Sequence, residues 1–171
     1  KKGREKFSNS FLSIELGNYY QKRKQFKNAI EEYILSLFSN PGSSSSVARR
    51  ILIMGDDIDS KNIIEIKLLE MSNSNPVLIL PILSDHYFKH REFKKSFDTL
   101  LELSEIENFN AKTWLSFSNN LRKEKAYSLA VKSYQFTLKK DLKAYQYGEG
   151  LLGLAKTFED QISPIEKNDI I

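Results

Sequence analysis

The chain has 171 residues, of which 40% are hydrophobic and 28% charged, a composition typical of a folded protein rather than a disordered one. It has no Cys, which excludes disulfides, thiolate metal sites and thiol catalysis, and its 7 Gly and 4 Pro are too few for an all-β fold with many tight turns. The net charge of +4 indicates a lysine-rich solvated surface, because nucleic-acid binding requires clustered basic residues rather than a small excess.

The first predicted helix pair occupies residues 10–43, after an N-terminal extension of nine residues. Each helix carries its characteristic residues four apart, on one face. Gly17 and Ala29 are small where two antiparallel helices must approach closely, and Tyr20 and Tyr33 are large where the pair packs on itself and on its neighbour. The segment therefore predicts a helix–turn–helix unit.

The same spacing recurs in residues 45–76, 77–110 and 111–144. One residue marks the second helix of each copy, at steps of 35, 32 and 34 residues: Ala29, Ile64, Ser96 and Ala130. The fourth copy also has Trp114 in its first helix. A nearly constant period over four copies predicts a helical repeat.

A fifth first helix is predicted at residues 148–160, where Leu151, Leu154 and Phe158 repeat the spacing. Its partner helix is missing, so this helix is expected to close the stack, as terminal repeats often do. Residues 161–171 are left as an irregular C-terminal tail.

Three segments deviate from the repeat pattern, and each deviation predicts a local feature of the structure. Leu52 and Ile64 are bulky where the other copies have small residues, so the second helix pair should sit further apart or tilt differently. The serine-rich residues 42–46 predict a flexible connector, with Ser46 as a cap of the next helix. Pro81 must fall in the first turn of its helix, or that helix must begin late.

On these residues and this period the chain resembles the tetratricopeptide repeat family, with about four and a half repeats over residues 10–160. The resemblance implies an all-α fold, a right-handed superhelical solenoid of antiparallel helix pairs with about nine helices. It also implies a non-catalytic scaffold, whose first helices line a concave groove that grips a peptide or helix of a partner protein.

The groove residues that the resemblance implies are Phe11, Asn18, Lys22, Arg49, Ile53, Asp85, Phe88, Lys89, Lys112, Asn119, Arg122 and Lys123. They make a moderately basic groove with aromatic anchors, suited to an acidic and hydrophobic segment. The carboxylate clamp that some members use for chaperone tails is incomplete, because Ile14 and Leu115 stand where it needs Lys. Binding of chaperone tails is therefore not expected.

Two other patterns resemble a dinucleotide-binding motif and a zinc site, but each lacks other features that such a site requires. Gly148, Gly150 and Gly153 match a dinucleotide-binding motif, but no buried strand precedes them, so we interpret them as a linker followed by close helix packing. His86 and His90 share a helix face, yet a zinc site needs three or four ligands. No nucleophile or phosphate-binding motif is present, and no enzyme activity, metal or cofactor is predicted.

Alternatives to the peptide-binding scaffold stay open. The array could be an architectural segment that self-associates or packs against the rest of a larger protein, since a start without Met is typical of a fragment. Basic pairs such as Arg49–Arg50 and Lys139–Lys140 could line an RNA-binding surface, but interleaved acids make this the weaker interpretation. The apolar run at residues 77–83 is too short to span a membrane, and no compartment is predicted.

Overall fold

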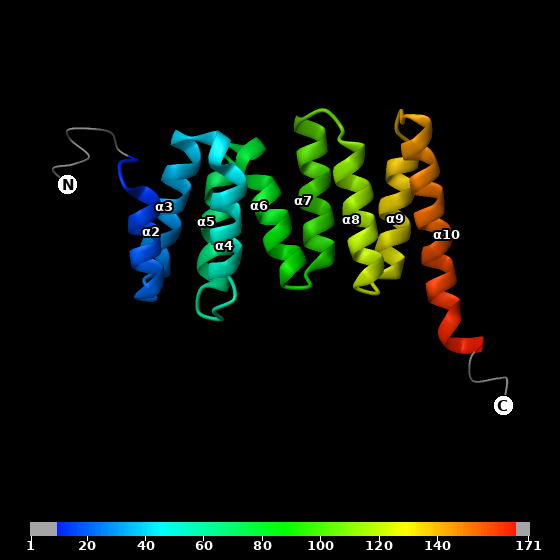
Figure 1. Ribbon diagram of the computed structural model, residues 1–171, viewed down its shortest axis with the longest axis horizontal. Coiled ribbons are helices and arrows are strands. Elements are labelled where there is room, and N and C mark those ends of the chain that lie inside the picture. The colour runs from blue at the N-terminus through cyan, green and yellow to red at the C-terminus, as the bar shows by residue number, and fades with distance from the viewer. Residues whose placement is uncertain (1–9, 167–171) are drawn as a thin grey trace. The chain divides into compact units, whose positions relative to one another are not determined.

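The structure is a computed structural model that describes residues 10–166, with side chains up to residue 162. Within this part of the chain every regular element is helical, and there are nine α-helices and one short 3₁₀ helix (Figure 1). The helices are α2 (Ser13–Lys22), α3 (Phe26–Ser39), η1 (Pro41–Ser43), α4 (Ser44–Met54), α5 (Lys61–Ser72), α6 (Pro76–Lys89), α7 (Phe93–Ile106), α8 (Ala111–Lys123), α9 (Tyr127–Leu138) and α10 (Ala144–Glu166).

The predicted all-α class of antiparallel helix pairs is confirmed for these residues, because short turns join helices that pack on each other. The right-handed superhelical course of the whole array and the exact repeat boundaries stay predictions. The expected N-terminal extension, residues 1–9, and residues 167–171 of the expected tail lie outside the described residues.

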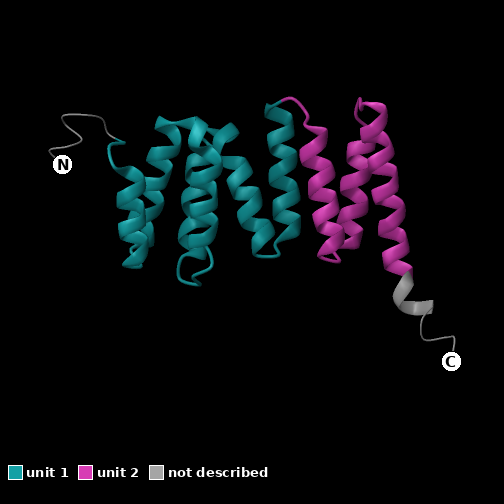
Figure 2. Ribbon diagram, viewed as in Figure 1, with its two compact units in different colours: residues 1–107 teal, residues 108–171 magenta. Residues whose placement is uncertain are grey.

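The chain divides into two compact units, residues 1–107 and 108–171 (Figure 2). At the boundary, Glu107 has an extended backbone that ends α7. Asn110 then begins α8, since its side chain accepts a hydrogen bond from the backbone N–H of Thr113 at 3.1 Å. Each unit is described by itself below.

In the first helix pair, a glycine allows the close approach that the sequence predicts. Tyr33 is fully buried, and a Cβ on Gly17 would lie only 2.5–2.6 Å from its ring. Ala29, on the same helix as Tyr33, is also fully buried. A side chain at position 17 would therefore force α2 away from α3.

Two other pairs use serine at this crossing. Between α6 and α7, Ser84 Oγ donates to the carbonyl of Ser96 at 3.0 Å, and Ser96 Oγ donates to the carbonyl of Ser84 at 2.8 Å. Between α8 and α9, Ser118 Oγ donates to Ser133 Oγ at 2.7 Å. All four side chains are buried, so the hydroxyls that make room for close packing also satisfy one another.

The turns inside the first, third and fourth pairs share one backbone conformation. Lys24, Arg91 and Lys125 each have a φ near +60°. After each, the next residue donates its N–H to the carbonyl five residues earlier at 2.9 Å, while the left-handed residue donates to the carbonyl three residues back. This is the Schellman ending of a helix, and its recurrence in three copies supports a true internal repeat.

The second pair, α4 and α5, departs from this arrangement. The two helices make little contact with each other, and each packs on α3 and α6 instead. This agrees with the sequence prediction that bulky Leu52 and Ile64 keep the two helices further apart. The connecting loop has no left-handed residue, and buried Ser60 secures it by donating to the carbonyls of Met54 and Asp57 at 2.6 and 2.7 Å.

Two local expectations in this unit are wrong. Pro81 lies inside α6, whose first residue is Pro76, because burial of the neighbouring Leu80 and Leu83 outweighs one lost backbone hydrogen bond. The serine-rich link is no flexible connector, because η1 leads directly into α4 at Ser44. Ser46 lies inside that helix and does not cap it.

The second unit is built around an aromatic cluster. Trp114 is 1% exposed, and its ring centroid lies 4.5 Å from that of Phe136 and 6.0 Å from that of Phe117. Phe109 extends the cluster, with its ring 6.0 Å from Phe136. Helix α10 packs on both α8 and α9.

Helix α10 corrects the prediction for the C-terminal part of the chain. It runs from Ala144 to Glu166, so Gly148 lies in a helix rather than a linker, and residues 161–166 are helical rather than irregular. The expected close packing is present, because a Cβ on Gly150 would lie 2.9 Å from Leu138 and one on Gly153 would collide with Tyr134. This packing compensates for the low helix propensity of glycine.

Candidate functional site

The residues predicted to line a groove fall in both units and are taken unit by unit. In the first unit they precede or lie on α2, α4 and α6: Phe11, Asn18, Lys22, Arg49, Ile53, Asp85, Phe88 and Lys89. In the second unit they all lie on α8: Lys112, Asn119, Arg122 and Lys123. Lys22, Arg49, Ile53 and Asp85 are exposed, whereas Phe11 and Phe88 are half-buried.

Two predicted residues of the first unit hold helices together. Asn18 Oδ1 accepts hydrogen bonds from Tyr33 Oη at 2.9 Å and from Arg50 Nη1 at 2.8 Å, which links α2, α3 and α4. Lys89 Nζ donates to the Leu52 carbonyl and pairs with Asp56, both at 2.6 Å. The Asn18 side-chain oxygen and the Lys89 ammonium group are already engaged within the chain, so Lys89 is a poor candidate for partner binding and Asn18 could contribute only its amide nitrogen.

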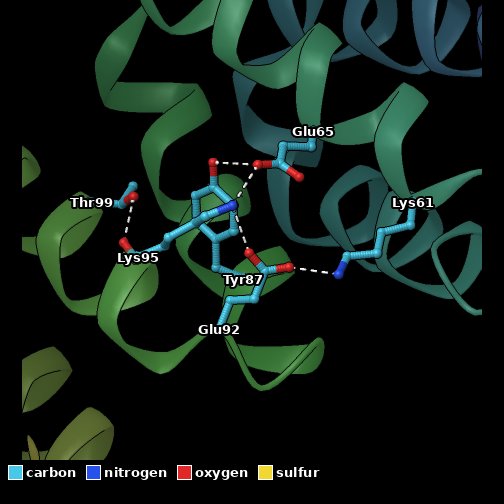
Figure 3. A network of polar contacts seen from close by, with 6 residues as sticks. All are labelled: Lys61, Glu65, Tyr87, Glu92, Lys95 and Thr99. Atoms are coloured by element: carbon cyan, nitrogen blue, oxygen red, sulfur yellow. Dashed lines mark hydrogen bonds and ion pairs between the residues drawn. The ribbon is translucent and has the colours of Figure 1, made fainter.

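A charged network joins α5 to α6 and α7 (Figure 3). Glu92 pairs with Lys61 at 2.5 Å and with Lys95 at 2.6 Å, and Lys95 also pairs with Glu65 at 3.0 Å. Hydrogen bonds from Lys61 and then Lys95 lower the pKa of Glu92 to about 2. Burial, together with the charge of Glu65, raises the pKa of Tyr87 to about 12. The charges offset one another, which indicates a structural role.

His86 lies fully buried in the first unit beside His90, with the ring centroids 4.6 Å apart. Neither ring nitrogen of His86 has a hydrogen-bond partner among the described residues. Burial and then the nearby His90 lower the pKa of His86 to about 4, so this ring is neutral at pH 7. No three His, Asp or Glu side chains converge as metal ligands in the described part of the chain.

In the second unit, α8 and α10 border an open cavity of about 590 Å³, which we call the α8–α10 recess. It is lined by Lys112, Leu115, Ser116, Asn119, Asn120, Lys123, Tyr145, Gln146 and Glu149. Three of the predicted groove residues, Lys112, Asn119 and Lys123, therefore lie together. The fourth, Arg122, is engaged elsewhere, in an ion pair with Asp160 of α10 at 2.6 Å.

The hydrogen bond of Asn119 fixes how it faces the recess. Its Oδ1 accepts from Tyr134 Oη at 2.6 Å, so the amide nitrogen is left as a donor. Burial raises the pKa of Tyr134, which keeps that hydroxyl protonated. The first copy repeats the arrangement with Asn18 and Tyr33, fifteen residues apart in both cases.

The sequence did not predict the residues that α10 contributes to the lining of the α8–α10 recess. Tyr145 and Gln146 precede the predicted start of the last helix at residue 148, and Glu149 fell in the glycine run interpreted as a linker. On α8, the spacing of Ser116 and Asn120 relative to Lys112 places all three on one helix face, a signal present in the sequence.

No model of a known protein family matches this chain, and no curated protein matches it. Among solved structures, the crystal structure of MamA protein is similar, with 17% sequence identity over 94% of this chain and 93% of that chain, and a TM-score of 0.43. Within residues 10–166, no helix is both long enough and apolar enough to cross a bilayer.

Proposed function

We propose that this chain is a non-catalytic protein-interaction scaffold whose α8–α10 recess binds an acidic and hydrophobic peptide segment of a partner protein. The observation that carries the proposal is the lining of the recess. Two lysines, several amide groups and an exposed tyrosine face one open cavity on the first helices of adjacent copies. The groove expected from the family resemblance shares Lys112, Asn119 and Lys123 with this lining and is also moderately basic.

The charge of the recess favours an acidic ligand. Lys112 and Lys123 are exposed at the two ends of α8, and Glu149 is the one acidic residue in the lining. An acidic side chain at either lysine would form charge-assisted hydrogen bonds, which are stronger than neutral ones. The amide donor of Asn119, one helical turn from Lys123, suits a carbonyl or carboxylate oxygen of the same ligand.

The recess also offers apolar contact. Leu115 forms part of its buried lining, at 2% exposed, and Tyr145 stands at its edge with 66% of its surface exposed. An exposed tyrosine supplies a rigid apolar ring with a polar tip, a combination enriched in protein interfaces. A peptide that alternates acidic and large apolar side chains would use both features.

The test uses fluorescein-labelled 12-residue peptides in which Glu alternates with Leu or Phe, and a matched set with Lys in place of Glu. Fluorescence polarisation with the full chain should show saturable binding of the acidic set and none of the basic set. Lys112→Glu combined with Lys123→Glu should weaken binding by about tenfold or more, because it reverses both flanking charges.

The matched control is Lys132→Glu, on an exposed position of α9 that does not line the recess. It should leave peptide affinity within about twofold. Equal loss in the control variant, or equal binding of acidic and basic peptides, contradicts the proposal. A labelled poly(U) strand serves as the RNA probe, and tight, steeply salt-dependent binding of that probe alone would favour RNA instead.

A further inference from the structure

Asn119, in the lining of the α8–α10 recess, is the last member of a series of polar contacts that begins on α10. Arg122 Nη1 donates to Asp160 Oδ2 at 2.6 Å, and Tyr134 Oη donates to Asn119 Oδ1, also at 2.6 Å. The Arg122 guanidinium also lies beside the Tyr134 hydroxyl. Burial raises the pKa of that hydroxyl, and the charge of Arg122 and a hydrogen bond from it partly offset the increase. Asp160 is therefore connected to the recess through Arg122, Tyr134 and Asn119.

The direction of each hydrogen bond in this series is set by the chemistry of its members. A guanidinium group has donors but no acceptor, so Arg122 cannot accept the hydroxyl proton of Tyr134. The described acceptor of that proton is Asn119, and only the oxygen of its amide group can accept it. If the amide were turned over, its nitrogen would lie against the hydroxyl, and a fully buried tyrosine would lose its acceptor. The contacts therefore turn the amide nitrogen of Asn119 away from Tyr134.

Packing between α9 and α10 holds the Tyr134 hydroxyl in its place. A Cβ on Gly153 of α10 would lie 2.4 Å from Tyr134 Oη, so glycine leaves the space that the hydroxyl occupies. A larger residue at position 153 would push the hydroxyl away from Asn119. The hydrogen bond to Asn119 thus depends on the close fit of α10 as well as on Arg122.

The first unit contains a second version of the same arrangement. Asn18 Oδ1 accepts hydrogen bonds from Tyr33 Oη at 2.9 Å and from Arg50 Nη1 at 2.8 Å, and Tyr33 is fully buried. Arg122 lies on the same helix as its asparagine, whereas Arg50 lies on α4 and Asn18 on α2. An arginine and a buried tyrosine therefore hold the oxygen of an asparagine in both copies, although the arginine comes from different positions.

We propose that Tyr134 is a positioning residue, held by Arg122, that keeps the amide nitrogen of Asn119 turned toward the recess, so that the ligand must place a hydrogen-bond acceptor there. The inference rests on the proposed function, because it concerns how the same recess selects its peptide. A carboxylate or carbonyl oxygen satisfies the amide nitrogen. A ligand N–H group at this point would leave two donors facing each other, which binding sites reject strongly. Arg122, expected to contact the partner, acts instead through Tyr134.

The orientation of Asn119 is tested without a ligand, by NMR of the full chain labelled with ¹⁵N in the asparagine side chains. A hydrogen bond to the amide oxygen increases the double-bond character of the C–N bond, so the two NH₂ protons of Asn119 should exchange places slowly. Tyr134→Phe should speed this exchange by about threefold or more. Asn120, exposed in the same lining, supplies the reference signal. Equal exchange rates in the variant and the unmodified chain overturn the inference.

Peptide binding tests the consequence for selection. In the fluorescence polarisation assay with acidic peptides, Tyr134→Phe should weaken binding by about fivefold, because Asn119 must then be ordered when the peptide binds. The matched control is Tyr33→Phe, which removes the equivalent hydrogen bond in the first unit and should change affinity by less than about twofold. Circular dichroism confirms that both variants are folded. Equal weakening in the two variants contradicts the role of Tyr134.

Asn119→Asp separates this inference from the proposed function. One carboxylate oxygen would accept from Tyr134 and the other would face the recess as an acceptor, so affinity for acidic peptides should fall by about tenfold or more. Asn120→Asp adds the same charge to the same lining and should cost less than about threefold. Equal losses overturn the inference. An unmodified chain that binds no acidic peptide overturns the proposed function, and the NMR exchange rates then still decide the orientation of Asn119.

Discussion

Helices α8 and α9 pack together along a close crossing, whereas α4 and α5, which occupy the equivalent place in another copy, scarcely touch. The two pairs differ at the crossing position of each helix. Ser118 and Ser133 meet at the crossing of α8 and α9. In α4 and α5, the sequence spacing places the bulky residues Leu52 and Ile64 at the equivalent positions.

The difference teaches that the size of one side chain per helix decides whether a pair closes on itself. When the position is small, the helices meet and a short Schellman turn joins them. When it is bulky, each helix finds its contacts on α3 and α6, and buried Ser60 secures a longer loop. The repeat tolerates this because stacked neighbours, rather than one pair, bury the core.

The largest expected effect comes from giving the close pair the bulky residue of the open one. Ser118→Leu should destabilise the second unit by about 3 kcal/mol, since Ser118 is fully buried and the change both overpacks the crossing and removes the hydrogen bond to Ser133. Urea unfolding followed by the fluorescence of Trp114, the single tryptophan, measures this unit.

The reciprocal change supplies the control. Leu52→Ser should cost about 1 kcal/mol or less, because Leu52 is only half-buried and no close crossing depends on it. Circular dichroism follows this change in the first unit. Equal losses in the two variants would contradict the idea that the crossing residue separates the two pairs.

The next largest effect is a loss of stability in acid, which should be greater in the first unit than in the second. Both histidines, His86 and His90, lie in the first unit, and the pKa of His86 is lowered to about 4 by burial and by His90. Because the unfolded chain binds a proton near pH 6.5 and the folded chain does not, stability is complete above pH 6.5 and falls as the pH drops toward 4. The loss from this one group is about 3 kcal/mol at pH 4.

Thermal unfolding at pH 7.0 and pH 4.5 measures this effect. The lower pH should reduce the melting temperature seen by circular dichroism more than that seen by Trp114 fluorescence. His86→Phe should remove most of the difference. The neighbouring charges of Lys61, Glu65 and Glu92 are present in both proteins and act as an internal control. An unchanged pH dependence in the variant would contradict the assignment to His86.

The smallest effect concerns the turns. Lys125 has a φ of 61°, a conformation that glycine adopts without strain, so Lys125→Gly should stabilise the second unit by about 0.5–1 kcal/mol. The loop between α4 and α5 has no such residue, and Asp59→Gly there should be neutral or slightly destabilising. Urea midpoints at constant slope measure both, and a stabilising effect of Asp59→Gly would contradict the comparison.

Much of this fold could be predicted from the sequence, because its period depends on side-chain size at fixed positions. The small Gly17, the large Tyr33 and the bulky Ile64 each indicated a local geometry that the structure contains. The errors came where tertiary packing overrode local preference. Pro81 stays inside α6 because its neighbours are buried, and Gly150 stays inside α10 because it packs on Leu138.

The candidate site was predicted only in part, for a related reason. Lys112, Asn119 and Lys123 follow from the face of one helix, which spacing alone reveals. Their neighbours Tyr145 and Gln146 depend on where α10 begins, and the glycine run concealed that start. The sequence spacing also does not show which predicted groove residues form hydrogen bonds within the chain. The side-chain oxygen of Asn18, for example, accepts hydrogen bonds from Tyr33 and Arg50.

The buried hydroxyls between α6 and α7 also have a consequence for misfolding. Ser84 and Ser96 satisfy each other only when the two helices are aligned as they are here. A slip of one residue along either helix would leave both hydroxyls dry and unbonded, at a cost of about 1–3 kcal/mol each. Because the copies of this chain resemble one another, such buried hydrogen-bonded pairs would disfavour the packing of a helix against the wrong neighbour during folding.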